Sequence, residues 1–320
     1  MFASWFGLNK LTIPPGQLFL LSALFLMPVL SPSFFGWLTG VLAVPVFFLL
    51  VTNGYDTGKK LVFSSLALAG LAALLVQQLD VFLFTLTLIP LGFTLFKSAH
   101  TGESAAISGG KGLATLGLTW LFFWGVYGAI TGINPYTQLL KVLDLGLQQT
   151  LELSSSKEAD LSPEMVLGLN QVTAVMREIV PKLLPGLLLS MVTVTVWINM
   201  VLVNGLTGRF SGTAPWGKYS TWKLPEQLVW MPIIAIVMVL VGTGSVQNAG
   251  AWLLMIAGMF YFFQGLAVFI ALLERWRVPF FVRMILYFVC IIQSYGLIFI
   301  AFLGLTDVWF NFREKNNDNF

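Results

Sequence analysis

The residues of this chain that could do chemistry are polar side chains set within long apolar stretches. Asn199, Gln264 and Gln293 each lie in such a stretch, Tyr261 precedes Gln264 by three residues and so shares its helix face, and Tyr295 follows Gln293. An amide in hydrocarbon needs a hydrogen-bond partner, so it faces other helices or a wet cavity. These five residues predict a binding site for a neutral or zwitterionic small molecule. The alternative is that they only join one helix to another.

The composition places these residues in a membrane protein. Of the 320 residues, 57% are hydrophobic and only 10% are charged, and the mean hydropathy is +0.86. A soluble domain carries about 25% charged residues, so most of the outer surface here is expected to face lipid. The net charge of +3 is too scattered for a nucleic-acid partner. With one cysteine, Cys290, and one histidine, His100, we expect neither a metal site nor a cofactor.

Long apolar runs define the elements that must position the polar residues. A membrane-spanning helix needs about 20 mostly apolar residues. We therefore predict an all-α bundle of about nine spans that forms one integral membrane domain over residues 1–320. The first and seventh runs are short, and Gln293–Tyr295 interrupts the last, which is either one tilted helix or two half-helices. The nine runs are Gly16–Leu30, Phe34–Val51, Leu61–Leu79, Val81–Phe96, Leu113–Ile130, Gly186–Val203, Leu228–Val241, Ala249–Leu273 and Pro279–Leu305.

The basic residues occupy alternate loops. Lys59 and Lys60 follow the second run, and Lys97 and Lys111 flank the loop after the fourth. Further basic residues follow the sixth and eighth runs, namely Arg209, Lys218, Lys223, Arg275 and Arg277. Loops rich in Lys and Arg stay in the cytoplasm. This predicts a multi-pass protein of the bacterial inner membrane with a cytoplasmic N-terminus, and nine full crossings would place the C-terminus outside.

The connection over residues 131–185 is long enough to have its own structure. Apolar residues recur at helical spacing from Tyr136 to Leu151 and again from Met165 to Ile179. We therefore expect an extracytoplasmic amphipathic helical hairpin that covers the bundle, lies on the membrane or acts as a lid. Pro181 and Pro185 are expected to break the chain before the sixth span.

The remaining motifs favour structural roles over a nucleotide site or an enzyme. Ser108–Gly112 reads Ser-Gly-Gly-Lys-Gly, which lacks the spacing of a phosphate loop and predicts a flexible cytoplasmic loop. No acid–base pair can be named, which disfavours an enzyme. Tryptophans near the predicted span ends are expected to anchor the protein at the membrane interface; they are Trp216, Trp222, Trp230, Trp276 and Trp309.

Three stretches carry a resemblance to a known family: Trp222–Pro225, Tyr261–Val268 and Leu303–Arg313. Together they resemble the YybS-like family of bacterial multi-pass membrane proteins, whose function is unknown. In general character the chain is also similar to the substrate-binding components of energy-coupling-factor vitamin transporters, although no binding residue can be transferred from them.

Two main hypotheses of function follow. The first is a small-molecule transport or substrate-binding component without its own ATPase. Its partners would be the lipid bilayer, a small solute and an ATPase or membrane protein docked on the basic loops. The second is a non-transporting scaffold or envelope assembly factor that uses the hairpin as its contact surface. A membrane enzyme ranks third.

Overall fold

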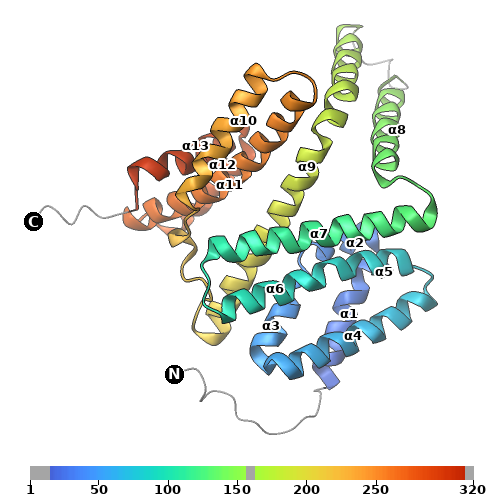
Figure 1. The fold of residues 1–320 in the computed structure, drawn as a ribbon, viewed down its shortest axis with the longest axis vertical. Coiled ribbons are helices and arrows are strands. Elements are labelled where there is room, and N and C mark those ends of the chain that lie inside the picture. The colour runs from blue at the N-terminus through green and yellow to red at the C-terminus, as the bar shows by residue number, and fades with distance from the viewer. Residues whose placement is uncertain (1–14, 156–162, 314–320) are drawn as a thin grey trace, which may run out of the picture. The chain divides into compact units, whose positions relative to one another are not determined.

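The computed structural model describes residues 15–155 and 163–313, and within these ranges the regular structure is entirely helical (Figure 1). The α-helices are α1 (Pro15–Leu30), α2 (Pro32–Thr39), α3 (Ala43–Asn53), α4 (Tyr55–Leu75), α5 (Leu79–Thr85), α6 (Ile89–His100), α7 (Ala105–Thr131), α8 (Pro135–Ser155), α9 (Pro163–Ser211), α10 (Trp230–Val241), α11 (Ser245–Arg275), α12 (Phe280–Ile292) and α13 (Ser294–Phe310). Short 3-10 helices are η1 (Leu86–Leu88), η2 (Tyr219–Thr221) and η3 (Glu226–Val229). The all-α class predicted from the sequence is confirmed.

The helices divide into two compact units. Unit 1 contains the described parts of Met1–Trp120, Met191–Val229 and Gly258–Phe320, and unit 2 contains Leu121–Ser190 and Trp230–Ala257. The long helices α7, α9 and α11 each contribute residues to both units. The single domain expected from the sequence stays a prediction.

All nine predicted runs form helices, but the count of about nine spans is not confirmed. Among the described residues, five helices are long and apolar enough to cross a membrane, or up to seven if each of two bent pairs counts as one span. The two remaining apolar segments, Pro15–Leu30 and Glu226–Val241, are shorter. A run of this length spans less than the hydrocarbon core because a helix rises only about 1.5 Å per residue.

The bent pairs interrupt the second and ninth predicted runs. Helices α2 and α3 meet at 52°, and α12 and α13 meet at 105° around Gln293. A bend frees backbone carbonyls that need other donors. At the first bend, the Asn199 side chain of α9 donates from Nδ2 to the Gly40 carbonyl oxygen at 2.6 Å.

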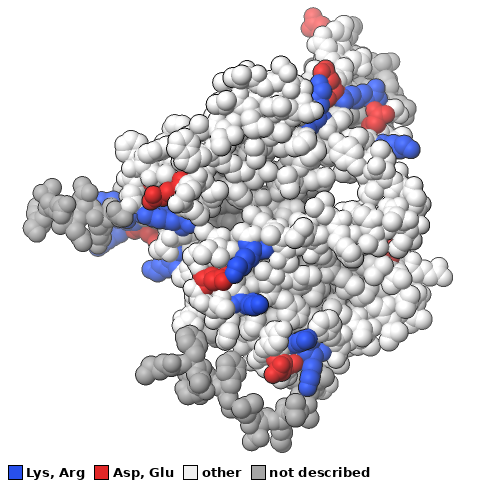
Figure 2. Space-filling view, in the orientation of Figure 1, with Lys and Arg blue, Asp and Glu red and all other residues white. Residues whose placement is uncertain are grey.

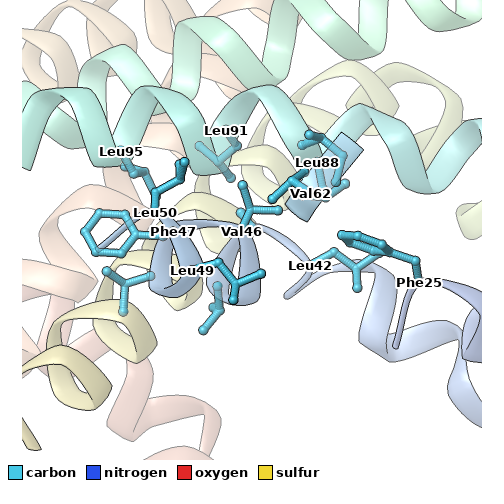
Figure 3. Close-up of a cluster of buried hydrophobic side chains, with 14 of the residues drawn as sticks. Phe25, Leu42, Val46, Phe47, Leu49, Leu50, Val62, Leu88, Leu91 and Leu95 are labelled. Carbon is cyan, nitrogen blue, oxygen red and sulfur yellow. The ribbon is translucent and has the colours of Figure 1, made fainter. Parts of the chain in front are cut away.

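The core of unit 1 lies where the N-terminal helices pack together. Figure 3 shows its side chains, among them Phe25 of α1, Phe47 of α3 and Leu91 of α6. Small residues let the backbones approach, because a Cβ atom at Gly92 would lie 2.8 Å from Val46 Cβ. Close van der Waals packing of this kind is the main attraction between helices in lipid.

In unit 2, the predicted chain break at Pro181 and Pro185 is wrong. Both prolines lie inside the continuous helix α9. Since Pro185 has no N–H, the Pro181 carbonyl oxygen loses its helical partner, and the Tyr136 hydroxyl of α8 donates to that oxygen at 3.1 Å. The Tyr136 side chain thus replaces the bond that Pro185 removes, within a helix that continues through both prolines.

Helix α8 and the start of α9 form the two arms of the predicted hairpin. Arg177 pairs with Asp144 across the arms, with 2.8 Å between Nε and Oδ1. Residues 156–162, which connect the two arms, lie outside the described residues. The side of the membrane on which the hairpin lies stays a prediction.

The surface is what a lipid-facing protein requires. Large apolar side chains are exposed on many helices, such as Phe122 of α7, Leu240 of α10 and Phe281 of α12. Figure 2 shows that Lys, Arg, Asp and Glu gather in a few groups with uncharged surface between them. In water, so much exposed apolar area would drive aggregation.

Helices α11 and α13 of unit 1 cross where two glycines, Gly265 and Gly304, let their backbones touch. A Cβ atom at Gly265 would overlap the Ile300 carbonyl oxygen, and a Cβ at Gly304 would overlap the Tyr261 carbonyl oxygen. Only glycine permits this approach, which holds α13 against α11.

The Gly265→Leu substitution is therefore expected to destabilise the protein, by about 3 kcal/mol or more, because the crossing helices must separate. The measurement is the thermal unfolding midpoint in mild detergent. Gly258→Leu is the matched control, since Gly258 lies on the same helix and its Cβ position has nothing within 4 Å. Equal midpoints for the two variants would contradict the crossing.

Candidate functional site

A cavity of about 470 Å³ lies within unit 1. Its walls come from the first turns of α7, the second half of α9, the segment Tyr219–Leu228 and the middle of α11. The volume falls within the range of about 300–1,000 Å³ typical of small-molecule sites. The lining residues are Ala105, Ala106, Gly109, Gly110, Leu113, Thr193, Val196, Trp197, Met200, Tyr219, Trp222, Lys223, Leu224, Pro225, Gln227, Leu228, Phe260, Phe263 and Gln264.

Aromatic side chains from three segments form one wall. Trp197 of α9 and Phe263 of α11 stack with 4.3 Å between ring centroids and an interplanar angle of 3°. Trp197 Nε1 donates to the Tyr219 hydroxyl oxygen at 3.1 Å, and that hydroxyl donates to the Phe263 carbonyl oxygen at 2.7 Å. Burial raises the pKa of the Tyr219 hydroxyl well above its ordinary value, so the group stays protonated.

Gln264, one of the residues predicted from the sequence, lies in the cavity wall and joins two distant segments. Its Oε1 accepts from the Leu224 backbone N–H at 3.1 Å, and its Nε2 donates to Asp307 Oδ2 at 3.1 Å. Both ends of the amide are therefore bonded to the protein. In this structure Gln264 holds the wall in place.

A buried ion pair continues this network. Arg313 Nη2 lies 2.6 Å from Asp307 Oδ2, and the side chains are only 7% and 1% exposed. Arg313 Nη1 also donates to the carbonyl oxygens of Ser220 and Trp222, at 3.2 and 2.6 Å. The residues after α13 are thus fastened to the segment that borders the cavity. No sequence pattern indicates this pair. Asp307 lies just after an apolar run and Arg313 lies six residues later, a spacing that does not place two side chains on one helix face.

The segment between α9 and α10 is held by two tryptophans that were expected at the membrane interface. Trp216 is buried and donates from Nε1 to Ser108 Oγ at 2.8 Å, and Trp222 donates from Nε1 to the Trp216 carbonyl oxygen at 3.1 Å. Asn204 bonds the backbone of Trp216 and Gly217. The interface prediction is therefore wrong for Trp216, which is buried, whereas Trp222 is partly buried and Trp230, Trp276 and Trp309 are exposed. Position near a span end does not distinguish the two cases.

The structure does not bring the other predicted site residues into the cavity lining. Asn199 is fully buried, and its Nδ2 donates to Gly40 and Thr195 carbonyl oxygens at 2.6 and 2.8 Å. Tyr261 is buried at the α11–α13 crossing, and its hydroxyl has no hydrogen-bond partner among the described residues. Gln293 and Tyr295 lie exposed at the bend between α12 and α13. As a ligand-binding set these five residues remain a prediction, and only Gln264 lines the cavity.

The start of α7 corrects another expectation. Ser108–Gly112 is helical rather than a flexible loop. Gly112 packs closely against α9, since a Cβ atom added there would lie 2.9 Å from Val196 Cγ1. Ser108 Oγ also bonds Ser98 Oγ at 2.7 Å. In the preceding turn, hydrogen bonds from Lys111 and Ser98 lower the pKa of Glu103, so this carboxylate is ionised at neutral pH.

The lining of the cavity is mostly apolar, with a few polar side chains. The polar side chains of the lining are those of Gln264, Gln227, Tyr219, Thr193 and Lys223, with the indole N–H groups of Trp197 and Trp222. The described residues contain no group of three or more His, Cys, Asp and Glu side chains that could hold a metal ion.

The fold, the exposed apolar surface and the cavity define a multi-pass helical membrane protein. The family described as predicted membrane protein DUF2232 matches residues 19–308, and the chain belongs to that family. Among curated proteins and among solved structures, none matches this chain.

Removal of one partner from the buried ion pair is expected to be costly. Asp307→Asn leaves Arg313 buried without its counter-ion, which should lower the free energy of unfolding by about 3–5 kcal/mol. The control is Asp144→Asn, whose partner Arg177 is half exposed and whose loss should cost less than about 1 kcal/mol. Thermal midpoints in one detergent compare the two variants. A smaller loss for Asp307→Asn than for Asp144→Asn would refute a structural role for the pair.

Proposed function

We propose that this protein is a membrane-embedded binding component for a small molecule, which it holds in the unit 1 cavity. The observation that carries this proposal is an apolar cavity of about 470 Å³ whose wall is held by Gln264, Asp307 and Arg313. A wall fixed by buried polar contacts keeps a site formed before the ligand arrives, which lowers the cost of binding.

The stretches that resemble the YybS-like family support this site. Trp222–Pro225 and Tyr261–Val268 supply lining residues, and Leu303–Arg313 supplies Asp307 and Arg313. We propose the YybS-like group within the wider family on this basis. The likeness to energy-coupling-factor components adds only the idea that a binding component without an ATPase would need a gradient or a partner ATPase to drive transport.

The second candidate is a scaffold or assembly factor without a ligand. It is favoured by the pairing of Gln264 and Asn199 inside the protein, which is how amides behave when they only join helices. The two candidates differ in one respect, because a scaffold has no need for the cavity to stay open.

Purification of the full chain in mild detergent, followed by mass spectrometry of what it retains, tests the binding function. Gly110 lines the exposed edge of the cavity and its Cβ position has nothing within 4 Å, so Gly110→Leu places a side chain in the opening. We expect this variant to retain less ligand by about tenfold or more, equivalent to a loss of about 1.4 kcal/mol.

Gly117→Leu is the matched control for this experiment. Gly117 lies two turns further along α7, also has nothing within 4 Å and does not line the cavity. This variant should retain the ligand at the wild-type level. Retention by both variants, or absence of any saturable ligand from the wild type, would favour the scaffold.

We also infer that the basic loops face the cytoplasm of a bacterial inner membrane. Ser220 Oγ lies 3.3 Å from Glu274 Oε2, and Lys223 Nζ lies 2.6 Å from Asn311 Oδ1, so the segment after α9 and the ends of α11 and α13 lie together in unit 1. The α10–α11 pair therefore starts and finishes at this common end, and so does the α12–α13 pair. This supports a cytoplasmic end for α13, in place of the outside end expected from nine full crossings.

Cysteine labelling tests this topology on a Cys290→Ser background. Lys218→Cys, Arg275→Cys and Phe310→Cys should be protected from a membrane-impermeant maleimide in intact spheroplasts, whereas Gln149→Cys in the hairpin and Thr243→Cys should be labelled. All five sites should react after permeabilisation, which controls for burial. Labelling of Phe310→Cys but not of Lys218→Cys in intact cells would overturn the returning α12–α13 pair.

A further inference from the structure

We propose that the ligand of the unit 1 cavity is a single-chain amphiphile with an anionic headgroup, whose chain fills the cavity and whose headgroup lies beside Lys223. This inference rests on the proposed binding function and adds the class of ligand. It also replaces the neutral or zwitterionic solute predicted from the sequence.

The polar atoms of the inner wall are already paired within the protein. Trp197 Nε1 donates to Tyr219, the Tyr219 hydroxyl donates to Phe263, and Trp222 Nε1 donates to Trp216. Gln264 has partners at both ends of its amide. A polar ligand group placed against this wall would lose its water without gaining a strong new partner. The part of the ligand that enters must therefore be apolar.

The rest of the lining suits a hydrocarbon chain. Most of it is aliphatic or aromatic, with Leu113, Val196 and Met200 on one side and Phe260 and Phe263 on α11. Methionine and leucine adapt to a flexible chain because their side chains change rotamer easily. Small residues at the start of α7 leave the space that the chain would occupy, since Gly110 has nothing within 4 Å of its Cβ position.

A basic side chain, Lys223, stands at the exposed edge of the cavity. Lys223 is the charged residue of the lining, and with Gly110, Pro225 and Gln227 it forms the exposed part of the wall. The Lys223 ammonium donates to Asn311 Oδ1 at 2.6 Å, and as a cation with three N–H donors it also attracts a carboxylate or a phosphate and repels a cation. Lys223 follows the apolar α9 helix in a basic loop, which is where the headgroups of membrane amphiphiles lie. The hydrocarbon chain of the ligand can therefore lie in the cavity while its headgroup lies beside Lys223.

Four probes with the same oleyl chain separate the chain from the headgroup: oleate, oleyl phosphate, oleyl alcohol and oleylamine. Native mass spectrometry of the full-length protein, at one fixed concentration of a neutral maltoside detergent, gives the affinity of each. We expect saturable binding of one molecule, with oleate and oleyl phosphate tightest, oleyl alcohol next and oleylamine weakest. The ratio of the first two distinguishes a free fatty acid from a phosphate-headed lipid.

Lys223→Gln should weaken oleate and oleyl phosphate by about two- to fivefold, the effect of a partly exposed ion pair, and should leave oleyl alcohol unchanged. Lys218→Gln is the control, because Lys218 lies in the same loop outside the lining. Gly110→Leu should weaken all four probes and Gly117→Leu none.

The outcomes separate this inference from the function on which it rests. If oleyl alcohol or oleylamine binds as tightly as oleate, or if Lys223→Gln changes nothing, the anionic headgroup is refuted. If none of the probes binds while a retained molecule still depends on Gly110, the amphiphile is refuted and the binding function stands. If neither the probes nor any retained molecule responds to Gly110→Leu, both fail.

Discussion

In lipid, a backbone carbonyl or N–H without a partner has no water to turn to, and this constraint governs the arrangement of this protein. Regular helices meet it along most of the chain. At the bend between α2 and α3 and at Pro185 in α9, a side chain from another helix supplies the bond: Asn199 reaches the carbonyl of Gly40, and Tyr136 reaches the carbonyl of Pro181. At these two places a polar residue within an otherwise apolar helix has a structural use.

The same requirement shapes the cavity. The segment between α9 and α10 has few helical hydrogen bonds of its own, so Asn204, Gln264 and Arg313 bond its backbone from outside. Because these contacts turn the polar atoms toward one another, the face left for the cavity is mainly apolar. The stability of the segment and the chemistry of the site therefore have one cause, and a ligand that fits must resemble hydrocarbon where it is buried.

Much of the fold was predictable from hydropathy because that signal is local. Each of the nine apolar runs became helical, and the interruption at Gln293–Tyr295 became a bend. The predictions that failed concern what a residue touches. Pro185 was expected to break the chain, but α9 continues through it and Tyr136 bonds the carbonyl of Pro181. Ser108–Gly112 was expected to be a loop, but it is helical and packs against Val196. Trp216 was expected at the interface, but it is buried and bonds Ser108. Sequence position carries no information about a partner some forty or a hundred residues away.

Part of the cavity lining was likewise predictable from the sequence and part was not. Gln264 was identified because an amide in an apolar run is conspicuous, whereas Trp197 and Phe263 were missed because aromatic residues are ordinary in such runs. Composition and apolar run length by themselves determined that this is a helical membrane protein with many crossings, since transfer into lipid depends on residue type alone. Only the tertiary structure decided which polar groups are paired between helices and where a cavity remains. These depend on distances between segments far apart in the chain.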